Sequence, residues 1–221
     1  MPRTLSEKIF EDFCKHKGIR CKPVKVDRNR TPDYDIFLPR RKVVVEVKEI
    51  TPNAIEKASE AELKAGRPTE VTLTPGQRVR GKIADAALQI KTGVQRRYPG
   101  LLVLFDSSFV AGHLDPYQIR VAMYGFETIV LAVPENPRVS AYPIDRKYGP
   151  RRKMTPTHNT SISAIGVLTT PQKGKVELTI YHNIHALVPL PYALFAEYRV
   201  RQFKLAQARQ GTIAGWEEIV G

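Results

Sequence analysis

The residues best suited to chemistry lie within 31–50, TPDYDIFLPRRKVVVEVKEI, where two aspartates precede a basic turn and a valine run that contains Glu46 and Lys48. Side chains alternate between the faces of a strand, so Glu46 and Lys48 share one face, and Asp33 and Asp35 share a face of the preceding segment. Pairing of the two segments as a hairpin brings one aspartate opposite Glu46. We therefore expect two carboxylates and an ammonium group to converge.

Such a cluster has the ligands that a hard divalent cation requires, because Mg²⁺ binds through one or two carboxylates and retains several waters. A metal ion there would lower the pKa of a bound water and neutralise charge that develops on a phosphate, and a nearby ammonium group can orient that water. The pattern therefore indicates hydrolysis of a phosphodiester. A solvated strand face with a Glu–Lys pair is the alternative for the triplet at 46–48 alone.

Two helical patterns flank this stretch. Residues 4–17 place apolar side chains on one stripe, with Thr4 and Glu7 spaced as a capping box. Residues 77–97 show the same periodicity, and their polar side carries Arg78, Lys82 and Gln89. Both helices therefore carry polar groups that could reach the carboxylate cluster.

In this order and spacing, the chain resembles the PD-(D/E)xK nuclease superfamily, whose members have the restriction-endonuclease-like fold. The resemblance covers residues 4–133 in the αβββαβ order of that family. The residues that carry it are Pro32-Asp33, Glu46-Val47-Lys48, Glu7 and Gln89.

The resemblance implies a role for each of these positions. Asp33 and Glu46 would bind the catalytic metal, with the carbonyl of Val47 as a further ligand. Lys48 would serve the attacking water, and Glu7 would help to hold the metal or its waters. Gln89 would complete the catalytic set.

Several assignments stay open within the motif. Asp35 could replace Asp33 as the ligand, and Glu11, one helical turn from Glu7, could replace that residue. Lys82 is as well placed as Gln89 to reach a phosphate. An excursion at 51–75, with a short helix expected at 53–66, separates the strand from its helix more than is usual in the family, which weakens the assignment of Gln89.

The remaining pattern predicts an α/β fold, in which a mixed β-sheet is flanked by helices and followed by a C-terminal β-hairpin and helix extension. We expect a nuclease-like core at 1–133 and a basic loop with the extension at 134–221, packed on the same domain. The expected elements are a central strand at 101–105, a helix at 115–124, a buried strand at 128–133, a surface loop at 134–160, hairpin strands at 161–168 and 175–182, and a helix in the second half of 186–207.

Basic residues in the predicted loop could grip a nucleic-acid backbone. Lys147, Arg151 and Arg152 surround a tyrosine that could stack on a base, and Arg78 and Lys82 add charge from the helix. A solvated loop is the alternative for the first three. His182 and His185 lack the further ligands that a transition-metal site needs, so we expect a polar turn there.

Composition limits the classes of protein. The 221 residues contain 35 Lys and Arg against 22 Asp and Glu, a net charge of +13 that favours nucleic acid as the partner. No apolar run approaches the roughly 18 residues that cross a bilayer, and the amino terminus lacks the features of a secretory signal. The two cysteines suit free thiols. We expect a cytoplasmic protein.

These observations together predict a Mg²⁺-dependent or Mn²⁺-dependent DNA nuclease, a hydrolase of the restriction endonuclease-like type. One alternative is a catalytically silent DNA- or RNA-binding protein of the same fold that acts with a partner. A basic RNA-binding or ribosome-associated protein is a third reading, supported by the charge alone. If the substrate is a duplex, a homodimer with two active sites is expected, because both strands must be cut.

Overall fold

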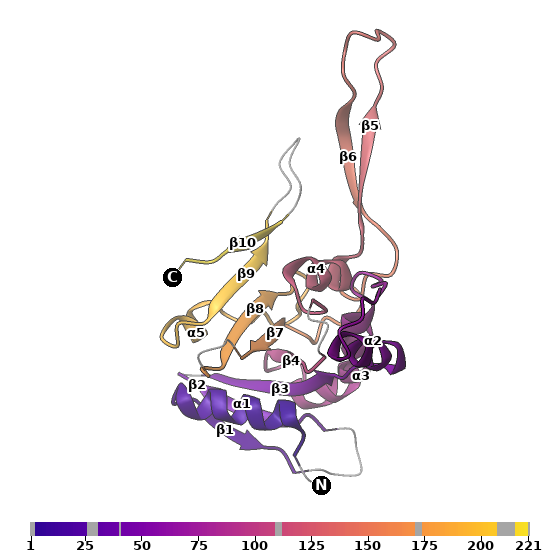
Figure 1. Ribbon diagram of the computed structural model, residues 1–221. Helices are drawn as coiled ribbons and strands as arrows, with labels where there is room; N and C mark the ends of the chain where they lie inside the picture. Colours follow the sequence, from indigo (N-terminus) through magenta and orange to yellow (C-terminus); the bar gives the residue numbers. More distant parts are fainter. Residues whose placement is uncertain are drawn as a thin grey trace.

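The computed structural model describes residues 3–25, 31–39, 41–108, 112–170, 174–206 and 215–220, without the side chains of 146–148. The first half contains α1 (Leu5–His16), β1 (Arg20–Pro23), β2 (Tyr34–Leu38), β3 (Arg41–Ile50), α2 (Ala54–Lys64), α3 (Gln77–Val94) and β4 (Gly100–Asp106). The second half contains α4 (Pro116–Tyr124), β5 (Glu127–Ala132), β6 (Tyr142–Tyr148), β7 (Ala164–Thr169), β8 (Glu177–His182), α5 (Ala193–Ala196), β9 (Arg201–Leu205) and β10 (Trp216–Glu218). Figure 1 shows their arrangement.

One large mixed sheet organises the chain. Its eight strands follow the order β1-β2-β3-β4-β7-β8-β9-β10. Strands β1 to β3 are antiparallel, β3, β4 and β7 are mutually parallel at the centre, and β8 runs antiparallel to β7 and parallel to β9. The sequence prediction of an α/β fold is therefore confirmed at the level of a mixed sheet with helices. The central place of β4 and the β7–β8 hairpin are also as expected.

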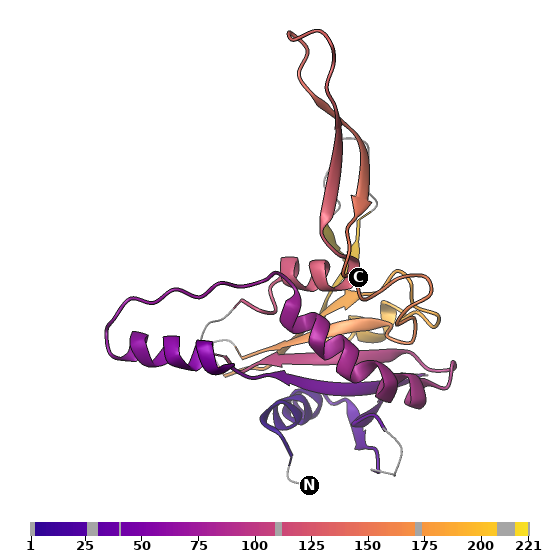
Figure 2. The ribbon, with the colours of Figure 1, turned by 90° about the vertical axis from the view of Figure 1, so that its right-hand side faces the viewer.

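Helices cover both faces of this sheet (Figure 2). On one face, Val43, Val45 and Val47 pack in a core with Phe10 and Phe13 of α1. The core on the opposite face joins Val44 of β3 to apolar side chains of α3 and α4. This alternation follows from the pleat of β3 and confirms that Glu46 and Lys48 share one face, which is the face covered by α3. Thr4 and Glu7 form the predicted capping box of α1.

The prediction for 128–160 was wrong in two respects. Strand β5 was expected to be buried in the main sheet, but it forms a separate two-stranded ribbon with β6, inside the segment that was predicted to be loop. Figures 1 and 2 show the ribbon projecting away from the body beyond α4. An apolar run predicts a strand well, but it does not reveal whether another layer covers that strand.

The expected C-terminal helix is also corrected. Within the described residues 186–206, the short helix α5 is the only helix, and Arg199, whose φ of 52° lies in the left-handed region, follows it. The chain then extends as β9 beside β8, where Phe203 stacks on Tyr181 at a centroid distance of 5.4 Å. Pairing with a neighbouring strand has overridden local helix propensity here.

The excursion at 51–75 contains the expected short helix, α2, and projects from one end of the sheet (Figure 2). Cys14 and Cys21 are free thiols, as predicted. Within the described part of the chain, no helix combines the length and apolar character needed to cross a membrane.

Candidate active site

The hairpin of β2 and β3 decides which aspartate meets Glu46. Tyr34 pairs with Val45 and Asp35 with Val44, and extension of this register by one residue places Asp33, just before β2, opposite Glu46. Asp35 instead lies beside Lys42, whose Nζ is 3.1 Å from its Oδ2. The predicted pairing therefore involves Asp33, and Asp35 belongs to a separate ion pair.

Glu46 is the centre of the resulting network. Its side chain is 0% exposed, and Lys48 Nζ lies 2.6 Å from Oε1. The Nε2 of Gln89 donates to the same oxygen at 2.8 Å, and the backbone N–H of Asp33 donates to Oε2 at 3.2 Å. Asp33 accepts a hydrogen bond of 2.8 Å from the N–H of Val47. The structure thus brings together all four predicted groups of the β2–β3–α3 set.

The two carboxylates resist ionisation together. Burial, followed by the charge of Asp33, raises the pKa of Glu46 to about 7, although Lys48 opposes the rise. Burial also raises the pKa of Asp33, and the nearby charge of Glu7 adds to this effect. A second cation beside the pair would relieve both shifts, because an opposite charge favours the ionised form.

The first helix offers one carboxylate to this network. The charge of Glu7 acts on Asp33, so Glu7 lies on the side of α1 near the site, and its Oε2 also accepts a 2.6 Å hydrogen bond from the N–H of Thr4. Glu11 pairs with Arg3 at 2.7 Å and accepts from the hydroxyl of Tyr34 at 3.0 Å. Of the two candidates, Glu7 therefore has the closer electrostatic link to Asp33.

The donor set is compatible with a magnesium site built on two carboxylates. Among the residues that the structure describes, no three His, Cys, Asp or Glu side chains form a group placed to hold a metal ion. Magnesium does not require such a group, since one or two carboxylates with waters and substrate phosphates suffice. Asp33, Glu46 and Glu7 against Lys48 give a local charge of −2 when all are ionised, within a chain of net charge +13. The charge and chemistry of the pair therefore suit a divalent cation.

Helix α3 runs antiparallel to β3 and spreads its polar face along it. Gln89 reaches Glu46, and Arg78, three turns earlier, reaches the carbonyl of Thr51 just beyond the end of β3. Lys82 lies on the same face between these two points, because residues two turns apart project in one direction. Among the described residues, Lys82 makes no ion pair, so its charge is available beside the site.

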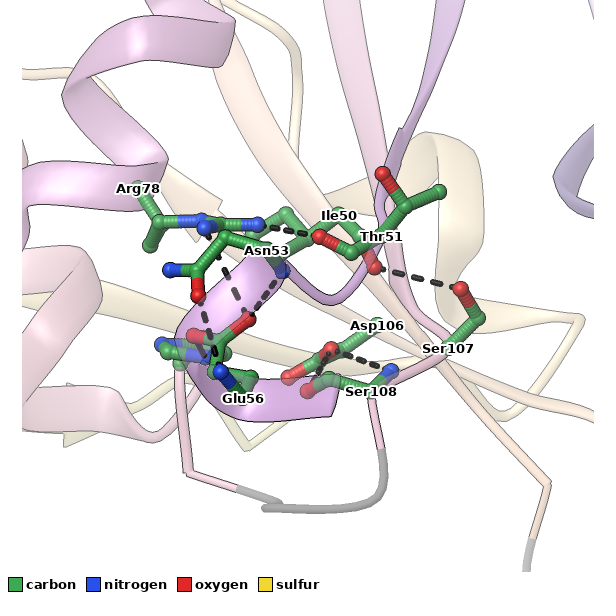
Figure 3. A network of polar contacts seen from close by, with 9 residues as sticks. Ile50, Thr51, Asn53, Glu56, Arg78, Asp106, Ser107 and Ser108 are labelled. Atoms are coloured by element: carbon green, nitrogen blue, oxygen red, sulfur yellow. Dashed lines mark hydrogen bonds and ion pairs between the residues drawn. The ribbon is translucent and has the colours of Figure 1, made fainter. Parts of the chain in front are cut away.

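Arg78 contacts the segment between β3 and α2, a structural role that the sequence did not reveal (Figure 3). It bonds the carbonyl of Thr51, and its Nη1 lies 3.6 Å from Oε2 of Glu56. Glu56 is buried in the capping box of α2 with Asn53, and His113 Nε2 lies 2.9 Å from its Oε1 without the alignment of a hydrogen bond. Arg78 therefore anchors the base of the excursion to α3.

The predicted basic contacts of the 146–153 run lie beyond α4. Arg151 and Arg152 are exposed, and the side chain of Lys147 lies outside the described residues. The backbone of this run is held on α4 by hydrogen bonds from Lys153 and Met154 to Ala122 and Met123. The structure does not bring these arginines into the Asp33–Glu46 network.

The histidine segment at 182–185 was expected to form a polar turn. His182 is buried, and its Nε2 lies 3.0 Å from Oε1 of Gln202, so it belongs to the packing of β8 and β9.

Arg80 of α3 was not predicted as a functional residue. It is buried, and its Nη1 has no hydrogen-bond partner among the described residues. An arginine three residues before the core residue Ile83, beside the apolar stripe of the helix, was the available signal.

Comparison of the chain with protein-family models, with curated proteins and with solved structures gives no match.

Proposed function

We propose that the chain is a Mg²⁺-dependent or Mn²⁺-dependent DNA nuclease of the PD-(D/E)xK superfamily, with a restriction-endonuclease-like core. The observation that carries the proposal is the position of Asp33, one residue before β2, opposite Glu46 of β3, with Lys48 in contact with the Glu46 carboxylate. The order α1, β1, β2, β3, α3, β4 around this pair supports it, with α2 as an insertion.

Each group of the chain has a task in this proposal. Asp33 and Glu46 would hold the metal ion, which when bound supplies an activated water and neutralises charge on the phosphate. Lys48, with 24% of its side chain exposed, reaches from solvent to the carboxylate pair and can orient a water near it. Gln89 fixes the carboxylate of Glu46 through its 2.8 Å hydrogen bond. Lys82, on the same face, can contact the phosphate backbone.

Nucleic acid is the substrate that charge favours. The net charge of +13 attracts a polyanion and accelerates its encounter with the protein. The carboxylates of Asp33 and Glu46 would repel an anionic phosphate, and a divalent cation bound between them and the phosphate would neutralise this repulsion.

Cleavage of DNA with and without Mg²⁺ tests this proposal. We expect Glu46→Gln and Lys48→Met each to reduce the single-turnover rate by about 100-fold or more, because the first removes a charged metal ligand and the second the group that orients the water. Glu49→Gln is the matched control, because Glu49 lies on the same strand with the opposite parity. Wild-type activity in both site variants, with folding verified by circular dichroism, would refute the assignment.

The enclosure of Glu46 favours a second candidate, a catalytically silent DNA- or RNA-binding protein of the same fold that acts with a partner. Both carboxylate oxygens of Glu46 are engaged by protein groups, and its side chain is 0% exposed. A metal ion could reach it only after Lys48 or Gln89 moves. Metal-independent binding of DNA or RNA without cleavage, across several divalent metals, would support this candidate over the nuclease. A preference for RNA with no response to Mg²⁺ would indicate an RNA-binding protein.

A further inference from the structure

Arg80 presents an unusual combination of charge and burial. It lies in the first turn of α3, is 7% exposed, and has an Nη1 atom without a hydrogen-bond partner among the described residues. Burial of a polar group without a partner costs free energy, and a buried charge costs more. Native structures rarely leave such a group unsatisfied, so its presence requires an explanation.

The surroundings of Arg80 add positive charge. Its guanidinium group faces the turn before α3 and the first turns of α4, since a Cβ built on Gly76 would lie 2.9 Å from Nη1 and 3.1 Å from the carbonyl oxygen of Gln118. Burial lowers the pKa of Arg80, and the nearby charge of Arg151 lowers it further. Arg151 is exposed and lies in the loop that is held on α4. No ion pair within the described residues compensates Arg80.

We propose that Arg80 and Arg151 form a phosphate-binding subsite at the junction of α3, α4 and the 149–154 loop. A guanidinium group offers a planar set of N–H donors that matches an oxyanion, and phosphate contacts of this kind position a nucleic-acid strand. The occupant is a backbone phosphodiester of the substrate, an assignment that rests on the proposed function. It would meet the exposed Arg151 first and reach the buried Nη1 of Arg80 after the 149–154 loop shifts. The subsite lies apart from the carboxylate pair, because Arg80 projects from the side of α3 opposite Gln89, two and a half turns away.

The test is the salt dependence of binding to a labelled DNA duplex, measured by fluorescence anisotropy in EDTA so that no cleavage occurs. We expect Arg80→Gln to weaken binding by about 10-fold to 100-fold, the value of a charged hydrogen bond. The slope of log K against log salt should fall by about 0.9, as for loss of one phosphate contact. Because both arginines would hold one phosphate, the losses of Arg80→Gln and Arg151→Gln should be less than additive in the double variant.

Arg201→Gln is the matched control, because it removes the same charge from an arginine that Glu218 satisfies at 2.8 and 3.0 Å. Binding by Arg80→Gln that equals that of Arg201→Gln would overturn the subsite. If Arg80→Gln fails to fold, Arg151→Gln in the exposed loop gives the same test. A wild-type protein that binds DNA through Arg80 but does not cleave it would remove the nuclease proposal and leave the subsite.

Inorganic phosphate provides a second readout. It should raise the melting temperature of the wild type and not that of Arg80→Gln, which should itself melt no lower than the wild type because an unpaired buried charge has been removed. Phosphate stabilisation that does not compete with DNA would assign the subsite to free phosphate and overturn the phosphodiester assignment. A large loss of stability with unchanged DNA affinity would show that Arg80 is structural.

The β5–β6 ribbon supports a second inference from independent observations. A two-stranded ribbon is marginally stable alone, and three or more strands with an apolar face are usually needed. Among the described strands, β5 and β6 pair only with each other, so each has an open edge. Exposed apolar side chains occur on the ribbon and its turn: Ile129, Leu131, Val133, Val139, Tyr142 and Ile144.

We infer that the ribbon joins two copies of this chain by edge-to-edge strand pairing. Residues 127–148 contain three acidic and three basic residues, so this segment is neutral while the rest of the chain carries the whole charge of +13. Contact between two bodies of that charge is opposed by repulsion, whereas contact between two neutral, apolar ribbons is not. A four-stranded sheet would pair one open edge of each ribbon and place apolar side chains of the two copies next to each other across the new strand pair.

Sedimentation velocity of the full chain across a concentration series tests the dimer. We expect a concentration-dependent dimer that Ile129→Lys weakens by at least about tenfold, because it replaces an apolar side chain of each ribbon by a charge that repels its copy. Ile55→Lys is the matched control, an exposed isoleucine of α2 away from the ribbon. A monomeric wild type, or equal effects of both variants, would overturn the inference. Loss of DNA affinity without a change in oligomeric state would assign the ribbon to nucleic acid instead.

Discussion

At the scale of single residues, Glu46 is the group whose ionisation the folded structure opposes most clearly. A carboxylate with no exposed surface lies beside a second carboxylate, and one lysine compensates the pair. Without a metal ion, ionisation of both carboxylates at neutral pH costs free energy, because burial and the mutual repulsion of the two charges both oppose it. The same features would give a bound cation a large effect on stability. The ionisation of Glu46 is therefore the most direct readout of the site.

The pH dependence of stability should report this ionisation. The pKa of Glu46 is about 7 in the folded chain and 4.5 ordinarily, so the folded state binds more protons between these values and stability falls as pH rises through this range. The loss is on the order of 3 kcal/mol. His182, with a pKa lowered to about 4 by burial, contributes the opposite slope. We therefore expect the unfolding free energy of the wild type to fall relative to that of Glu46→Gln between pH 4.5 and pH 8, as measured in urea without metal. A constant difference would contradict the shift.

Glu7 allows a structural role to be separated from a role in the site. Glutamine also serves in a capping box, so Glu7→Gln should keep stability within about 0.5 kcal/mol, whereas Glu7→Ala should lose about 0.5 to 2 kcal/mol. Removal of the charge should lower the pKa of Asp33 in both variants, which carbon NMR of the carboxyl groups can measure. If Glu7 helps to hold the metal, Glu7→Gln should cleave DNA more slowly than wild type. Equal cleavage rates would restrict Glu7 to the cap.

The sequence predicted the site correctly where the alternation of side chains along a strand determines which face each residue lies on. It placed Glu46 and Lys48 on one face of β3, and the structure confirms this placement. It could not choose between Asp33 and Asp35, because both have the same parity and only the register of the hairpin distinguishes them. Arg80 was missed for a related reason, since its isolation depends on the distant segments that contain α4 and Arg151.

At the scale of elements, helix α3 fixes the site because it packs closely on the β2–β3 hairpin. Gly93 permits this approach: a Cβ there would lie 2.6 Å from Cγ of Pro32 and 2.8 Å from Cγ1 of Val44. Gly93 thus lies against the segments that precede Asp33 and Glu46. A larger residue would push the helix that carries Gln89 away from them.

Paired glycine substitutions test this close packing. Gly93→Ala should destabilise the protein by about 1 to 3 kcal/mol through overpacking and should reduce cleavage by displacing Gln89. Gly81→Ala is the control on the same helix, where a Cβ meets nothing within 4 Å, and it should stabilise by about 0.5 to 1 kcal/mol. Urea unfolding of both variants measures the difference. Similar effects at the two positions would contradict the packing argument.

The elements that the sequence predicted are those whose signals are local. Helix α1 has a capping box and an apolar stripe, and β3 and β4 are apolar runs of strand length. Strands β5 and β9 were misplaced because their surroundings are set by distant segments. β9 is a strand because β8 offers it an edge, and β5 is exposed because its only described partner is β6.

At the scale of the whole molecule, the uneven distribution of charge separates two tasks. The body carries the excess of positive charge and would, as proposed, attract DNA, whereas the neutral ribbon would give two such bodies a surface for association without strong repulsion. Two copies joined through their ribbons would present two carboxylate pairs to one duplex. This arrangement would allow one active site to act on each strand.

Mixed dimers test whether the two sites act on separate strands, given both the nuclease and the dimer. Wild type and Glu46→Gln, mixed and allowed to exchange, should form hybrids with one working site. On supercoiled plasmid, these hybrids should accumulate nicked circles, while wild type mixed with Glu49→Gln should proceed to linear product, because Glu49 lies on the opposite face of β3. Gel electrophoresis of a time course separates the three DNA forms. Linear product formed at a merely diluted rate would show that each site cuts both strands independently, and the ribbon would then serve another purpose.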